Sequence, residues 1–288
     1  GRAPSTIEPI KDVPDVFDFP RDIQPILDRH CVACHDYEKT EKGGPFSGGV
    51  ILAGDHGPVY STSYVYLTKR RQFADGRNGL GNRAPRTIGS SASPLLKKLA
   101  GGHHGVKATP HESKMVRLWI EAGAPYPGTY AALGSGMVRN PNDSPGYRNA
   151  YRKRCAKCHK KQPDRFVAFN YTRPEKSLAL LKPLAREAGG YGMKKQVKRE
   201  GKTFKETCSV FKDTADPDYQ AMLSAIKAES KRLAEIKRFD MPGFRPNEHY
   251  IREMKFYGIL PNDLAADAPV DPYKTDQKYW ESFWYTAE

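Results

Sequence analysis

A pentapeptide of two cysteines and a histidine occurs twice in this chain. It reads CVACH at 31–35 and CAKCH at 155–159, and the two copies use four of the five cysteines. A Cys-x-x-Cys-His sequence is the attachment pattern of c-type haem, in which the thiols bond the porphyrin edge and the histidine binds the iron. The repeat therefore predicts two covalently bound haem c groups. Their attachment residues and proximal iron ligands are Cys31, Cys34, His35, Cys155, Cys158 and His159.

The same residues also fit other chemistry. A single copy is compatible with a reduced dithiol or with half of a zinc site, and all four thiols together could form one tetrahedral zinc site. A thioredoxin-like redox motif needs a surrounding βαβ pattern, which the sequence lacks. The recurrence favours haem at both positions, with the four-thiol zinc site as the alternative.

The length of 288 residues suggests two domains, and the signatures lie 124 residues apart, so each domain can hold one haem. Only 38% of residues are hydrophobic, and each porphyrin would add a large apolar surface to its core. A stretch rich in Gly, Pro and Asn at 134–146 marks the boundary. We expect a mainly α fold of two tandem cytochrome c-like haem domains, 1–140 and 141–288, with long irregular loops.

Apolar spacing and capping residues predict helices before each signature, at 19–30 and before Cys155. Further helices are expected at 110–122, 177–190, 217–236 and 248–257, with at most one short strand at 50–52. Both halves have the same order of elements: a helix, the signature, a long irregular stretch, the candidate distal ligands, and a helix that ends at Gly123 or Gly258. This parallel order supports two equivalent modules.

The sixth iron ligand in the first domain is expected just before the helix at 110–122, in GGHHGVKATPHE. His103 is preferred, with His104 and then His111 as alternatives, because His111 falls in the first turn of the helix. His30 adjoins Cys31 and is excluded by its position, and His56 is a weaker candidate.

In the second domain the corresponding stretch is RFDMPGFRPNEHY. Met241 is the preferred ligand because a thioether on the turn before Pro242 suits haem iron, and His249 is the alternative. The remaining thiol, Cys208, is expected to be a buried and unreactive residue.

Basic residues concentrate around the second signature. The chain carries a net charge of +14, and residues 151–212 contain eighteen Lys and Arg against five acidic residues. A solvated face, nucleic-acid binding and docking of an acidic redox partner are the three interpretations. No nucleic-acid motif accompanies the charge, so docking of an acidic partner protein is the preferred function and a solvated face the alternative.

No apolar run of 18 residues exists, so no transmembrane segment is expected. The chain begins at GRAPST without a leader pattern, which we interpret as a segment of a longer multidomain chain, the alternative being removal of a signal peptide. Because covalent haem attachment generally takes place outside the bacterial cytoplasm, a periplasmic or other extracytoplasmic location is expected.

Several stretches carry a family resemblance, namely FDFPRDIQPILDRHCVACHDYE, GGVILAGD, VRLWIEAGAPYPGTYAALG, NYTRPEKSLALLKPLAREAGGYG, IKRFDMPGFRPNEHYIREMKFYGILP and DQKYWESFWY. The chain resembles the C-terminal di-haem region of the hydrazine synthase alpha subunit and related proteins. The resemblance implies a preceding part with a β-propeller, a catalytic first haem and an electron-transferring second haem.

The chain departs from that family pattern beside its first signature. The resemblance implies a tyrosine iron ligand shortly after Cys-x-x-Cys-His, but Lys39 stands four residues past His35. Tyr37, two residues past His35, is the possible replacement, and a partly buried aromatic residue without a catalytic role is the alternative.

The preferred function is a di-haem c-type cytochrome module that relays electrons within or between larger redox proteins. The alternative is a haem enzyme, a hydrazine-synthase-like oxidoreductase whose open or tyrosine-ligated first haem acts on a small nitrogen or oxygen compound. A third possibility is an interaction domain in which the haems stabilise the fold.

Overall fold

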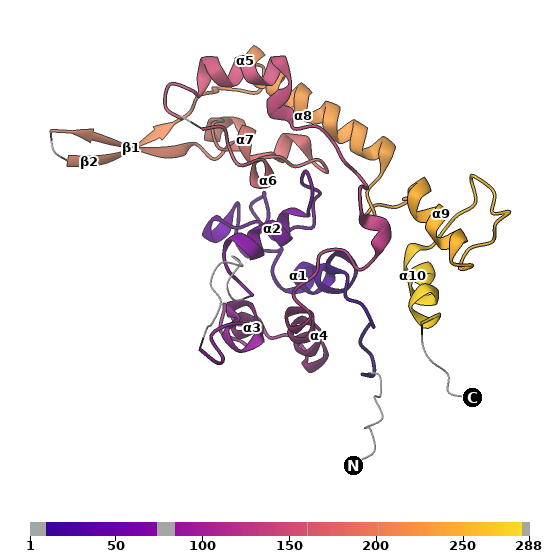
Figure 1. The fold of residues 1–288 in the computed structure, drawn as a ribbon. Helices are drawn as coiled ribbons and strands as arrows, with labels where there is room; N and C mark the ends of the chain where they lie inside the picture. The colour runs from indigo at the N-terminus through magenta and orange to yellow at the C-terminus, as the bar shows by residue number, and fades with distance from the viewer. Residues whose placement is uncertain (1–9, 74–83, 160, 201, 284–288) are drawn as a thin grey trace, which may run out of the picture.

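The computed structural model describes residues 10–73, 84–159, 161–200 and 202–283, with the side chains of 193–199 and 202–208 excepted. The described chain is mainly helical, as predicted (Figure 1). Its α-helices are α1 (Gln24–His30), α2 (Thr62–Lys69), α3 (Pro94–Leu99), α4 (Pro110–Glu121), α5 (Pro145–Arg154), α6 (Arg165–Ala168), α7 (Leu178–Leu181), α8 (Pro217–Ile236), α9 (Glu248–Phe256) and α10 (Pro272–Glu281). A π-helix, η1 (Phe19–Ile23), precedes α1, and short 3₁₀ turns include η4 (Tyr130–Ala132) and η6 (Pro174–Lys176).

The helices that deliver the two signatures form as predicted. In η1 and α1 the predicted apolar residues Phe19, Ile23, Ile26 and Leu27 are all buried. Helix α5 ends at Arg154, so that Cys155 is its C-terminal cap. Each helix therefore places its first cysteine at the point where helical hydrogen bonding ends.

Capping residues also start the other predicted helices where expected. The Thr109 hydroxyl accepts from the Glu112 N–H (3.2 Å) and the Glu112 carboxylate accepts from the Thr109 N–H (2.8 Å), which completes the capping box of α4. Asp216 caps α8 and Asn247 caps α9 through their side-chain oxygens.

Two local predictions were wrong. The helix expected at 177–190 is only α7, Leu178–Leu181, because Pro183 lacks the N–H that a longer helix needs. The optional strand at 50–52 is an irregular segment in which Ile51 and Leu52 are buried.

A β-hairpin occupies part of the basic region and was not predicted. Strands β1 (Met193–Arg199) and β2 (Lys202–Cys208) pair antiparallel, with Arg199 opposite Lys202 and Met193 opposite Cys208. Figure 1 shows this hairpin extending away from the helices. The sequence signal for this hairpin was the Glu200-Gly201 pair, which separates the two seven-residue stretches MKKQVKR and KTFKETC.

Buried apolar residues form three clusters. The first cluster comes from residues 17–126 together with Leu178, Leu181 and Phe239, and the second comes from residues 147–233. The third is small and consists of Ala131, Tyr250, Ile251, Met254 and Val270. Segments from the second half of the chain thus contribute to the core of the first half.

The helices that end before Gly123 and Gly258 pack in different clusters. Helix α4 packs in the first cluster beside the first signature, but α9 belongs to the third cluster with η4. The helix that packs against α5 is α8, and Figure 1 shows α9 and α10 in a separate lobe. Helix α9 is amphipathic like α4, but the apolar face of each helix meets a different partner.

Candidate haem sites

Both Cys-x-x-Cys-His sequences adopt the same backbone conformation at the end of a helix. The first cysteine N–H donates to the carbonyl four residues earlier, at 2.8 Å in both copies, and the following residue donates to the same carbonyl at 3.1 and 3.0 Å. The second cysteine and the histidine both donate to the first cysteine's carbonyl, at 3.1 and 3.0 Å in one copy and 3.1 and 2.9 Å in the other. Two thiols and an imidazole are thereby brought onto one compact turn at each site.

The His35 side chain is oriented by a backbone group. Its Nδ1 lies 3.0 Å from the carbonyl oxygen of Ser47, and a carbonyl can only accept, so Nδ1 carries the proton. The lone pair of the neutral ring is then on Nε2 and is available to bind a metal. Metal-binding histidines are commonly oriented by such a second hydrogen bond.

His103 faces His35 across the first site. The ring centroids are 5.9 Å apart and the ring planes differ by 21°. Two imidazoles that bind one metal ion from opposite sides, each through a bond of about 2 Å, have centroids about 6 Å apart. Loss of solvent, together with the nearby His104, His35 and Lys98, lowers the pKa of His103. The structure therefore places two imidazole rings side by side at the first site.

The other histidines of the first half occupy different surroundings. His104 lies beside His103, with ring centroids 4.5 Å apart, and is exposed. His111 is exposed in the first turn of α4, and the His30 ring lies 3.0 Å from the Glu112 carboxylate. The His56 ring lies 2.9 Å from the Thr172 hydroxyl, and burial lowers its pKa. The structure thus brings His103, of these five, into contact with the His35 ring.

Tyr37 is buried in the first cluster. Its hydroxyl lies 3.4 Å from the Thr62 hydroxyl, and burial raises its pKa far above the ordinary value. Tyr37 is thus a packing residue of the first cluster in this structure.

The second site is more open than the first. Cys158 and His159 are exposed, and the Tyr151 hydroxyl donates to the Lys161 carbonyl at 2.7 Å, which ties the segment after the signature to α5. Met241 is partly buried against the second cluster, as is Cys155. His249 is exposed on α9 beside the third cluster. Of the two predicted distal ligands, Met241 thus shares a cluster with the second signature.

The two signatures lie in different parts of the fold, with Cys31 packed beside the first cluster and Cys155 beside the second. The four described cysteines form no disulfide. In the part of the chain that the structure describes, no three His, Cys, Asp or Glu side chains gather into a metal-binding group, and the four thiols lie in two separate sites. A tetrahedral zinc site requires four protein ligands at one point, whereas haem iron takes at most two from the protein.

A polar network beside the first signature was missed by the sequence reasoning. Arg173 binds Asp36 and Asp55, each at 2.8 Å, and its guanidinium lies 5.1 Å from the centre of the Tyr37 ring. Asn170 also donates to Asp55. Asp36 follows His35 directly, so the segment around Arg173 clamps the first site from the second half of the chain.

The side chain of Cys208, and with it the prediction of a buried thiol, lies outside the described residues.

None of the helices in the described part of the chain combines the length and apolar composition needed to cross a bilayer. No protein-family model, curated protein or solved structure matches the chain. The resemblance to the hydrazine synthase alpha subunit stays a prediction from the quoted sequence stretches.

Proposed function

We propose that the chain is a di-haem c-type cytochrome module that transfers electrons. The observation that carries this proposal is the pair of identically folded Cys-x-x-Cys-His turns, one of which presents its histidine opposite a second imidazole. Cys31 and Cys34 would hold one haem, and Cys155 and Cys158 the other. When bound, each haem supplies a one-electron centre.

At the first site the protein orients the imidazole ring of His35. The Ser47 carbonyl accepts from the His35 Nδ1 and leaves Nε2 as the nitrogen that would bind the iron. Two histidines would fill both axial positions, which favours electron transfer over binding of a substrate to the iron. At the second site His159 and Met241 would be the corresponding ligands.

The resemblance to hydrazine synthase supports a second candidate, a haem oxidoreductase acting on a small nitrogen or oxygen compound. That function needs an open or tyrosine-ligated first haem. The burial of Tyr37 and the position of His103 favour the electron-transfer candidate. We also propose that the module works outside the cytoplasm as part of a larger chain. Its basic region, residues 151–212, would receive electrons from an acidic partner protein.

Mass spectrometry and visible spectroscopy of the protein produced with haem-attachment machinery test the proposal. We expect the mass of two haems above the polypeptide mass, and low-spin spectra for both. The double variant Cys31→Ala/Cys34→Ala should lose one haem and Cys155→Ala/Cys158→Ala the other. A colourless protein of polypeptide mass would refute the proposal, and a high-spin first haem would favour the enzyme.

A further inference from the structure

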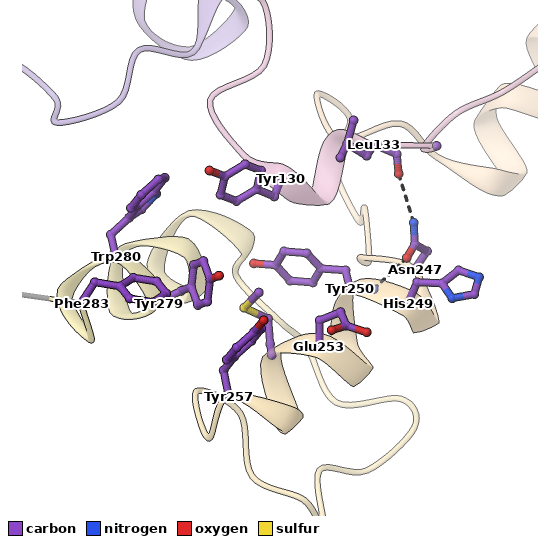
Figure 2. Close-up of a pocket in the computed structure, with 12 residues that line it drawn as sticks. Tyr130, Leu133, Asn247, His249, Tyr250, Glu253, Tyr257, Tyr279, Trp280 and Phe283 are labelled. Carbon is purple, nitrogen blue, oxygen red and sulfur yellow. Dashed lines mark hydrogen bonds between the residues drawn. The ribbon is translucent and has the colours of Figure 1, made fainter.

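A cavity of about 910 Å³ lies in the lobe formed by η4, α9 and α10 (Figure 2), and no residue of either signature lines it. Its volume falls in the range of small-molecule sites. Half of its twelve lining residues are aromatic, and these are Tyr130, Tyr250, Tyr257, Tyr279, Trp280 and Phe283. Neither haem site uses any of them.

The aromatic rings form the walls of this cavity instead of closing it. The centroid of the Tyr279 ring lies 5.2 Å from that of Tyr257 and 4.9 Å from that of Phe283. The centroids of the Tyr130 and Trp280 rings are 5.8 Å apart. Yet Trp280 is 43% exposed and Phe283 61% exposed. Figure 2 shows these rings lying around the open space between α9 and α10.

The lining of the cavity includes a carboxylate and no Lys or Arg, although the protein is strongly basic. Glu253 is the one charged residue of fixed sign among the described lining residues, which include no Lys or Arg in a chain that has 47 of them. Arg252, outside the lining, binds one Glu253 oxygen at 2.9 Å. Aromatic faces and a carboxylate both attract cations.

A second carboxylate lies behind the aromatic wall. Asp276 is 5% exposed and accepts from the Tyr250 hydroxyl at 2.6 Å and from the Tyr130 N–H at 2.9 Å. Among the side chains that the structure describes, no Lys or Arg forms an ion pair with Asp276. Its negative charge therefore acts on the Tyr250 ring and on the cavity in front of it.

We propose that this cavity binds a small quaternary ammonium compound, through cation–π contacts with Tyr257, Tyr279 and Trp280 and through the charge of Glu253. A quaternary ammonium is weakly hydrated and carries apolar methyl groups, so aromatic faces can replace its water at low cost. This site is independent of the haem function proposed above.

Calorimetric titration of the haem-loaded protein with choline, and with its neutral isostere 3,3-dimethylbutan-1-ol, tests the proposal. Because the two probes share size and shape, tighter binding of choline measures the contribution of charge. We expect choline to bind about 3- to 30-fold more tightly than the isostere, the range that one or two cation–π contacts supply. Equal affinities, or no binding of choline, would overturn the proposal.

Variants locate the site. Trp280→Ala should remove choline binding, Trp280→Phe should retain most of it, and Glu253→Gln should reduce the preference for choline over the isostere. Phe256→Ala is the matched control, because Phe256 is an 80% exposed aromatic residue of α9 that does not line the cavity. Unchanged choline binding by Trp280→Ala, with the helical circular dichroism of the parent, would place the ligand elsewhere and refute the assignment.

Discussion

Arg173 and Asp36 form an ion pair at 2.8 Å that joins the second half of the chain to the residue directly after His35. The same guanidinium binds Asp55 at 2.8 Å, and both carboxylates are largely buried. The two halves are therefore held together beside the first Cys-x-x-Cys-His sequence by polar contacts as well as by the apolar first cluster.

Replacing Arg173 by Met should lower the free energy of unfolding by about 2–3 kcal/mol, because two partly buried carboxylates lose their cation. Urea denaturation measures this change. Lys231→Met is the control, since the exposed Lys231–Glu235 pair on α8 should contribute less than about 0.5 kcal/mol. Adding Asp36→Asn to Arg173→Met should cost less than the two single changes together, and simple additivity would show that the pair does not interact.

His103→Ala should convert the first haem alone from low-spin to high-spin, because it removes the imidazole that faces His35. Visible and near-infrared spectra of the oxidised protein measure the change. His104→Ala and His111→Ala serve as controls and should retain the parent spectrum. A high-spin first haem in His104→Ala, with His103→Ala unaffected, would reverse the assignment.

Met241→Ala should convert only the second haem to high-spin and should lower its reduction potential, because a thioether ligand raises the potential. Redox titration followed by visible spectroscopy separates the two haems. His249→Ala should leave both properties unchanged, since His249 is exposed on α9. Loss of the second low-spin spectrum in His249→Ala would identify that histidine as the ligand instead.

Glu112 should make stability depend on acidic pH. Burial opposes its ionisation, but hydrogen bonds from Thr109, His30 and Arg29 outweigh burial and lower the pKa of Glu112 from 4.5 to about 2. The stabilisation is complete above the unfolded-state value of 4.5 and is lost as pH falls toward 2. Urea denaturation between pH 6 and pH 2 should show this loss for the parent protein.

Glu112→Gln should be less stable at pH 6, and its stability should fall less steeply below pH 4.5. Thr109→Ala separates capping from charge, because losing the hydroxyl cap should cost about 1 kcal/mol while Glu112 still titrates. An equally steep fall for Glu112→Gln and the parent would exclude Glu112 as the source of the pH dependence.

The basic hairpin should contribute to docking of an acidic electron donor. Reduction by an acidic donor protein should slow about tenfold as salt rises from about 0.01 to 0.3 M, because screening shortens the range of the attraction. Changing Lys194, Lys195 and Lys198 to Gln should weaken this dependence, whereas the same change at Lys227 and Lys231 of α8 should not. Stopped-flow measurements give both rates, and a salt-independent rate would contradict docking there.

Local features were predictable because they depend on neighbours in the chain. The helix running into Cys31, the Thr109–Glu112 capping box and the Asp216 cap all follow from hydrogen bonds within four residues. The conformation of both Cys-x-x-Cys-His turns is likewise local, since each is closed by bonds to the preceding helix and to its own first cysteine. The motif and its two haem groups could thus be proposed without a structure.

Tertiary structure decided which distant segments meet. The sequence placed His103 near the first site through an analogy of order, but only the fold brings its ring to 5.9 Å from the His35 ring. The tertiary structure also decided that α9 packs with η4 and α10 instead of α5, and that Arg173 contacts Asp36. An apolar stripe or a single charge is compatible with many partners, and the partner is selected by the packing of the whole chain, a property that local sequence does not encode.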